Sequence, residues 1–173
     1  MASGDQIIEL LPRGAMPPGS DYATIDTVAD ASTPNIVFDV LDFRGATGDE
    51  HADWGFEVPT WYAGTTGWTF KYKYAVDGAD VDIVDMEFRV LIIDDLDILT
   101  ADLLMDGQTA VSIQDTPAGT ADKFNYSATG GLTKANMGTP SVGDFVVVRA
   151  TRDISAATNT DDLQLKSILI TET

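Results

Sequence analysis

Acidic side chains are the commonest groups in this sequence that could do chemistry, with 28 aspartates and glutamates among 173 residues. They gather in two places, first at Asp77, Asp80, Asp82 and Asp85 and then at Asp94, Asp95 and Asp97. Carboxylate oxygens that converge from a tight loop suit Ca²⁺, and Asp77, Asp80 and Asp82 are the candidate ligands of that kind. Neither group has the glycine and closing glutamate of an EF-hand loop, and so acidic a chain forms such groups by chance. We therefore assign no metal site from the sequence.

The remaining reactive residues do not form a recognisable catalytic set. There is no cysteine, and the one histidine, His51, lies in an acidic loop beside Asp49, Glu50 and Asp53. Neither a Gly-x-Ser-x-Gly turn nor a phosphate-binding loop is present. A carboxylate pair for glycoside hydrolysis has no characteristic spacing, so a β-sandwich hydrolase stays open as an alternative. We predict a protein that is not an enzyme, with no catalytic residues and no cofactor.

Four aromatic residues could form a flat platform for a carbohydrate: Trp54, Trp61, Tyr62 and Trp68. Trp54 and Trp68 alternate with other residues as the inward side chains of a strand would, which favours core packing for them. Trp61 and Tyr62 lie in a corner between two predicted strands. These two are the candidate glycan contacts if the protein binds carbohydrate.

The net charge of −18 limits the classes of partner. Phosphate groups would be repelled, so we expect neither nucleic acid nor an anionic membrane as a partner. The sequence has no run of about 20 apolar residues that could span a bilayer. It also has no charged N-terminal region followed by an apolar run, so we expect synthesis in a cytoplasm without a visible export signal.

Residues 67–94 contain the two clearest strands, and the rest of the chain is organised around them. Trp68, Phe70, Tyr72 and Tyr74 alternate with Thr69, Lys71 and Lys73. A period of two places the aromatic rings on one face of a strand and both lysines on the other. The second strand, over 83–93, turns apolar on both faces towards its end, as a strand in the middle of a sandwich would. The pair reads as a hairpin or as two strands in facing sheets.

Further strands are predicted over 36–43, 54–58, 108–115, 123–128, 145–151 and 163–171, with one helix over 93–107. About eight strands and little helix predict an all-β fold, an antiparallel two-sheet sandwich covering residues 36–173. The long loop before the last strand could be closed by a salt bridge from Arg152 to Asp162.

Residues 1–35 differ from the rest because they combine prolines and glycines with one small apolar patch. The patch consists of Ile7, Ile8, Leu10 and Leu11. We interpret the segment either as a partly disordered leader or as an extended N-terminal arm whose apolar patch docks on this domain or on a neighbouring copy.

The order of several features resembles a known family. Trp54, Phe56 and Pro59 precede the corner at Tyr62 and Gly64, and the long alternating strand follows. Val142-Gly143-Asp144, the pair Arg152-Asp153, the loop over 160–162 and a closing Leu-x-Leu-x-x-Ile-x-Ile strand complete the pattern. This succession, over roughly residues 36–173, resembles small jelly-roll structural proteins of tailed bacteriophages, which decorate or cement the capsid, often as trimers.

The resemblance implies a virion structural protein on the capsid surface, synthesised in the host cytoplasm, with the major capsid protein as its partner and a homotrimer as its assembly. A cement protein gains affinity by repetition on a lattice. The apolar patch at Ile7, Ile8, Leu10 and Leu11 would then contact the adjacent subunit. The alternative is a carbohydrate-binding β-sandwich module of a tail fibre or tail protein, with Trp61 and Tyr62 on the glycan.

Overall fold

Two antiparallel sheets packed face to face form the protein in a computed structural model that describes residues 5–29, 36–45, 48–93 and 104–173. The first sheet has seven strands: β1 (Gln6–Leu10), β2 (Thr24–Ala29), β3 (Val37–Phe43), β5 (Trp68–Val76), β8 (Asn125–Tyr126), β9 (Gly130–Leu132) and β11 (Leu163–Glu172). The second has four: β4 (Glu50–Glu57), β6 (Val84–Ile93), β7 (Val111–Asp115) and β10 (Phe145–Arg152). The predicted all-β sandwich is confirmed, with more strands than the eight expected.

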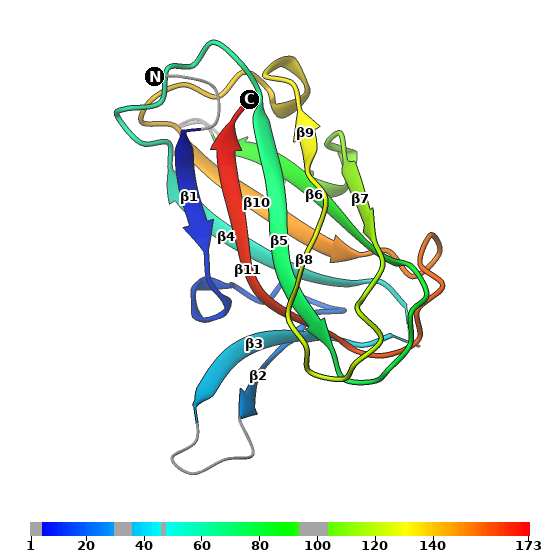
Figure 1. Cartoon of the computed structure of the whole chain (residues 1–173). Coiled ribbons are helices and arrows are strands. Elements are labelled where there is room, and N and C mark those ends of the chain that lie inside the picture. The colour runs from blue at the N-terminus through cyan, green and yellow to red at the C-terminus, as the bar shows by residue number, and fades with distance from the viewer. Residues whose placement is uncertain (1–4, 30–35, 46–47, 94–103) are drawn as a thin grey trace.

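The first sheet follows the order β2-β3-β11-β5-β8, with β1 added to β11 and β9 to β5. The second sheet follows the order β4-β10-β6-β7. In Figure 1 the strands β1, β11, β5 and β8 lie towards the viewer, and β4, β10 and β6 cross behind them. Three short 3-10 turns complete the described elements: Pro12–Gly14, Met105–Gly107 and Ala135–Met137.

The alternation predicted for β5 is confirmed. Trp68, Phe70, Tyr72 and Tyr74 are buried between the sheets, while Lys71 and Lys73 lie on the outer face and are only partly covered. Strands β5 and β6 belong to different sheets, so the second of the two interpretations is correct.

Aromatic rings join the two sheets at the centre of the sandwich. Phe70 of β5 stacks on Phe88 of β6, with ring centroids 5.2 Å apart and an interplanar angle of 9°. The hydroxyl of Tyr72 donates to the backbone carbonyl of Ile113 at 3.2 Å, which satisfies its polar end inside the core. Burial raises the pKa of Tyr72 well above its ordinary value, so this hydroxyl stays protonated.

The N-terminal segment is part of the sandwich, which revises the boundary expected at residue 35. Strand β1 pairs with β11, and β2 pairs with β3. Ile7 and Leu10 are buried in the core of this chain. Their side chains point into the core because β1 pairs with the C-terminal part of β11. Burying them removes apolar surface from water. Of the four patch residues, Leu11 is the one left exposed.

The helix predicted over 93–107 falls largely on 94–103, outside the described residues. At its two ends, Ile93 closes β6 and Met105–Gly107 form a 3-10 turn. Within the described ranges, no helix is long and apolar enough to cross a membrane.

Arg152 is a fully buried cation at the end of β10. Its guanidinium donates to the carbonyl of Phe43 at 2.9 Å and to the carbonyl of Asn159 at 3.0 Å. The sequence suggested a salt bridge to Asp162 instead, but the two guanidinium NH₂ groups are directed to backbone carbonyls. Burial lowers the pKa of Arg152, and nearby carboxylates, Asp162 foremost, oppose this shift. Through these two hydrogen bonds Arg152 links the loop before β11 to the end of β3.

We expect Arg152→Met to lower the free energy of unfolding by about 3 kcal/mol, because two buried carbonyls lose their charged donor. Urea denaturation followed by tryptophan fluorescence measures the change. Arg13→Met is the matched control, since Arg13 is exposed in its pair with Asp39, and its denaturation midpoint should stay that of the wild type. Equal midpoints for both variants would show that Arg152 does not brace the loop.

Asp42 provides a pH-dependent test of the packing beside β3. Burial, reinforced by the carboxylate of Asp162, raises the pKa of Asp42 to about 6. The folded state then binds a proton that the unfolded state releases near pH 4, so this group's contribution to stability is lost as pH rises from about 4 to 6.

We expect Asp42→Asn to gain on the order of 1 kcal/mol relative to wild type between pH 4 and pH 8, after a discount for the half-exposed site. Thermal or urea unfolding at several pH values measures the difference. A difference between variant and wild type that does not change with pH would contradict the raised pKa of Asp42.

Candidate functional site

The outer face of the seven-stranded sheet carries an exposed aromatic ring between two lysines. Lys71 and Lys73 point outward from β5 because their neighbours in the alternation point into the core. Tyr126 of β8 pairs directly with Lys73 in the sheet. The Tyr126 side chain is 64% exposed, the highest value among the described tyrosines, phenylalanines and tryptophans that are exposed.

Cations and rings interleave along this face. The Nζ atoms of Lys71 and Lys73 lie 5.5 and 5.3 Å from the centroid of the Tyr126 ring. Lys73 also lies 4.9 Å from the ring centroid of Phe124. Phe124 meets Phe38 of β3 edge-on at 5.3 Å. Cation–π attraction of this kind holds the lysine ammonium groups over the rings at modest strength, about 0.5–1 kcal/mol for each exposed pair.

A groove of about 220 Å³ runs between β5, β11 and β1 beside the exposed ring. It is lined by Glu9, Lys71, Tyr72, Lys73, Tyr126, Ser167 and Leu169. The groove therefore combines the solvent-exposed ring of Tyr126 with the ammonium groups of two lysines. The carboxylate of Glu9 and the hydroxyl of Ser167 also line it. A concave site with an apolar surface and a few polar groups is the usual form of a small-ligand site.

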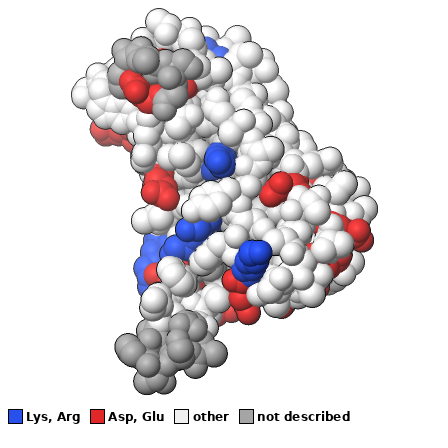
Figure 2. Space-filling model, in the orientation of Figure 1, with Lys and Arg blue, Asp and Glu red and all other residues white. Residues whose placement is uncertain are grey.

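Positive charge gathers on this face although the chain as a whole is acidic. Figure 2 shows most of the Lys and Arg side chains of this face in its middle and lower part, with Asp and Glu side chains beside some of them. Lys71, Lys73 and Lys166 make no ion pair with any carboxylate in the described part of the chain. Lys166 lies over the Phe38 ring at 5.1 Å and donates to the Asp39 carbonyl at 3.3 Å. The ammonium groups of Lys71 and Lys73 are therefore available to an external anion, whereas that of Lys166 is partly engaged by Asp39.

The residue pair predicted to contact a glycan does not form a platform. Tyr62 is buried, and its ring meets Trp68 edge-on at 6.1 Å. Its hydroxyl donates to the carbonyl of Thr66 at 3.1 Å. Trp61 is exposed, so the corner presents one indole ring and not two. The sequence signal for Tyr126 was the alternation of aromatic and polar residues over 123–128, which is typical of an exposed strand.

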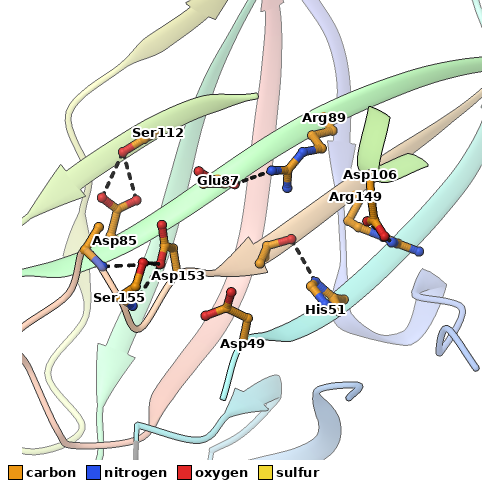
Figure 3. Close-up of polar contacts among 12 residues, drawn as sticks. Asp49, His51, Asp85, Glu87, Arg89, Asp106, Ser112, Arg149, Asp153 and Ser155 are labelled. Atoms are coloured by element: carbon orange, nitrogen blue, oxygen red, sulfur yellow. Dashed lines mark hydrogen bonds and ion pairs between the residues drawn. The ribbon is translucent and has the colours of Figure 1, made fainter. Parts of the chain in front are cut away.

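The outer face of the four-stranded sheet is also polar, but its charges are paired with one another (Figure 3). Arg149 of β10 binds both carboxylate oxygens of Asp53 at 2.8 Å and also contacts Asp106 at 3.1 Å. Arg89 pairs with Glu87 of the same strand at 2.7 Å. Such neutralised pairs brace neighbouring strands and leave little charge for a ligand.

His51 lies on this second face, where Nδ1 is 2.9 Å from the hydroxyl of Thr151. Burial, followed by the charge of Arg149, lowers the pKa of His51. Among the described residues, no carboxylate is hydrogen-bonded to the other ring nitrogen. A hydroxyl and an imidazole without that orienting partner do not make the three-membered arrangement that activates a nucleophile.

The carboxylates first considered for Ca²⁺ instead accept backbone hydrogen bonds between two loops. Asp77 accepts from the amide of Asp162 at 2.9 Å, and Asp80 accepts from the amides of Asp82 and Thr160. These backbone donors, that of Asp82 first, lower the pKa of Asp80. No group of three or more potential metal ligands exists within the described residues. Asp94, Asp95 and Asp97 lie outside them.

Three further cavities lie away from this face. One, of about 440 Å³, is lined by Thr65–Gly67, Gly131–Ala135 and Thr173 at one end of the sandwich, and its lysine, Lys134, donates to the carbonyl of Gly64. A second, of about 230 Å³, is apolar and lies among Met16, Tyr22, Ile25 and their neighbours. The third, of about 420 Å³, is lined by Leu91, Ile92, Gln108, Met137–Thr139 and Asp144. None of the three places a free cation beside an exposed ring, so the Tyr126 groove is the candidate functional site.

No protein-family model and no curated protein matches the sequence. The chain is similar to a β-1,3-glucan-binding CBM6 from Bacillus halodurans, with 8% identity and a TM-score of 0.51 over 99% of this chain and 100% of that one. It is similar to the CBM22-1 and GH10 modules of Clostridium thermocellum xylanase 10B, complexed with xylohexaose, with 11% identity and a TM-score of 0.50 over 100% of this chain and 29% of that one.

A third similar structure is a Bacillus thuringiensis Cry1Da tryptic core variant, with 11% identity and a TM-score of 0.53 over 96% of this chain and 23% of that one. The three proteins differ in kind, and the identities of 8–11% are far too low to assign a ligand to this chain. What the likeness establishes is the fold: this chain is a β-sandwich of the kind found in carbohydrate-binding modules.

Proposed function

We propose that this chain is a non-catalytic carbohydrate-binding β-sandwich module, with Tyr126 as the ring on which a sugar stacks. The observation that carries the proposal is the 64% exposed Tyr126 side chain, held at the edge of a groove between Lys71 and Lys73. A sugar ring has an apolar face of C–H groups and an edge of hydroxyls. An exposed aromatic ring with polar groups around it complements both.

The fold supports the same proposal. The Bacillus halodurans module is described as binding a β-1,3-glucan, and it matches this chain over nearly the full length of both. Modules of this kind bind without turnover, and we propose the same for this chain. The ligand position is new here, since the predicted corner at Tyr62 is closed by burial.

The first test is affinity electrophoresis of the folded chain in gels that contain laminarin, xylan, alginate or polygalacturonate. We expect at least one polymer to retard the wild type and Tyr126→Ala to bind about tenfold more weakly, because a central stacking contact is lost. Trp61→Ala and Phe145→Ala remove exposed rings elsewhere and should leave the retardation unchanged. Unretarded wild type in all four gels, or equal binding by Tyr126→Ala, would refute the proposal.

A second function, as a virion structural protein, is favoured by a different observation. Met16, Tyr22 and Ile25 are exposed around the apolar cavity of about 230 Å³. An apolar patch of this kind on a soluble chain is typical of a subunit contact. We place this contact between copies of the chain, as a homotrimer on the capsid surface that binds the major capsid protein, or in a tail fibre. The Tyr126 groove shares no lining residue with this cavity, so glycan binding is compatible with either position.

Light scattering of the purified chain tests this second function. We expect a mass of three chains, and a smaller mass for Ile25→Asp because the charge must be desolvated in the contact. Val81→Asp, an exposed apolar residue outside the patch, is the control that should keep the wild-type mass. A monomeric wild type would contradict the trimer and leave the carbohydrate-binding proposal standing.

A further inference from the structure

We infer that the Tyr126 groove selects acidic glycans, polysaccharides whose sugars carry carboxylate groups, over neutral ones. The inference rests on the proposed function and adds the ligand class. The first observation is that the groove carries unpaired positive charge although the chain as a whole is strongly acidic. The chain has 10 basic and 28 acidic residues, yet two of the basic ones line this single groove without a carboxylate partner. A neutral sugar requires hydrogen-bond donors and acceptors but gains little from unpaired cations.

The geometry suits a carboxylate beside a stacked sugar. Lys71 and Lys73 are two residues apart on β5, so their side chains leave the sheet about 7 Å apart on the same face. Both Nζ atoms lie within 5.5 Å of the Tyr126 ring centroid. A uronic acid residue stacked on that ring would place its carboxylate at the ring edge, within reach of the ammonium groups. Charge-assisted hydrogen bonds of this kind are stronger than neutral ones.

Lys166 extends the positive surface beyond the groove. It lies over the Phe38 ring, and Phe38 meets Phe124, which also contacts Lys73. The rings and ammonium groups thus continue from β8 to β3 across the sheet. A polymer with a carboxylate on successive sugars can engage several of these cations at once, which raises affinity through repeated weak contacts.

Negative groups near the path limit the binding. Glu9 is the carboxylate that lines the groove, and it opposes an approaching anion. Asp39 is occupied by Arg13 through two hydrogen bonds of 2.6 Å. Glu9→Gln should therefore tighten binding of an acidic glycan and have no such effect on a neutral one.

An acidic protein with a basic face could also bind a second copy of itself. An acidic segment of that copy is therefore the alternative occupant of the groove. The groove argues against this because the exposed Tyr126 ring would have to be covered by a carboxylate-rich surface, which does not complement an aromatic face. Nucleic acid is disfavoured by the net charge of −18, which repels a phosphate backbone outside the small basic face.

The experiment compares alginate and polygalacturonate, each with its carboxyl-reduced product, by isothermal titration calorimetry at low and moderate salt. Reduction of the carboxyl groups keeps the polymer backbone and removes the charge. We expect the wild type to bind at least one acidic polymer about tenfold or more tightly than its reduced form, in keeping with charged hydrogen bonds. We expect Lys73→Gln to lose most of that preference and Lys134→Gln, with the same loss of charge, to keep it.

The outcomes separate the inference from the proposed function. Equal affinity for acidic and reduced polymers, or a preference that Lys73→Gln does not diminish, overturns the acidic specificity while carbohydrate binding stands. Binding to laminarin or xylan alone does the same. No binding to any polymer overturns both. A lower mass for Lys73→Gln by light scattering, with no polymer binding by the wild type, identifies a second copy as the occupant and also overturns the inference.

Discussion

The pairing of β5 with β11 is the interaction on which the rest of the structure depends. Both strands lie in the middle of the seven-stranded sheet, and their inward residues fill the core shared with β6 and β10. Because side chains alternate along a strand, burying Phe70 and Tyr72 forces Lys71 and Lys73 outward. A slip of one residue would bury both lysines, so the core fixes the register of the outer face. Core packing therefore fixes the direction in which Lys71 and Lys73 leave the candidate site's central strand.

Charge pairing distinguishes the two outer faces of the sandwich. On the four-stranded sheet, Arg149 and Arg89 have carboxylate partners, and on the seven-stranded sheet Lys71 and Lys73 have aromatic rings instead. A ring attracts a cation without neutralising it, so the ammonium groups keep their charge available. The candidate functional face is the one whose cations lack a carboxylate partner. The amino-acid composition does not show which cations are paired.

The sequence predicted what depends on local pattern. The alternation over 68–74 and the apolar run over 83–93 identified β5 and β6, and about eight strand signals with little helix indicated an all-β sandwich. Strands β1, β2 and β9 were missed because their segments carry little local strand signal, and β1 and β9 pair with strands that are distant in the sequence, β11 and β5. Tyr62 was assigned to a glycan because exposure of a loop residue cannot be read from spacing, whereas its ring packs on Trp68. Tyr126 lay in a recognised exposed strand, but only the fold brings it beside Lys73.

Mapping a bound sugar onto the backbone tests the central claim most directly. Two-dimensional ¹H–¹⁵N NMR spectra of the folded chain, titrated with an oligosaccharide of galacturonic acid, report which amides sense the ligand. The account predicts saturable shifts centred on β5 near Lys71 and Lys73 and on β8 at Tyr126, with the four-stranded sheet unaffected. Shifts centred on the corner at Trp61, on the His51 face, or nowhere in the spectrum would contradict it.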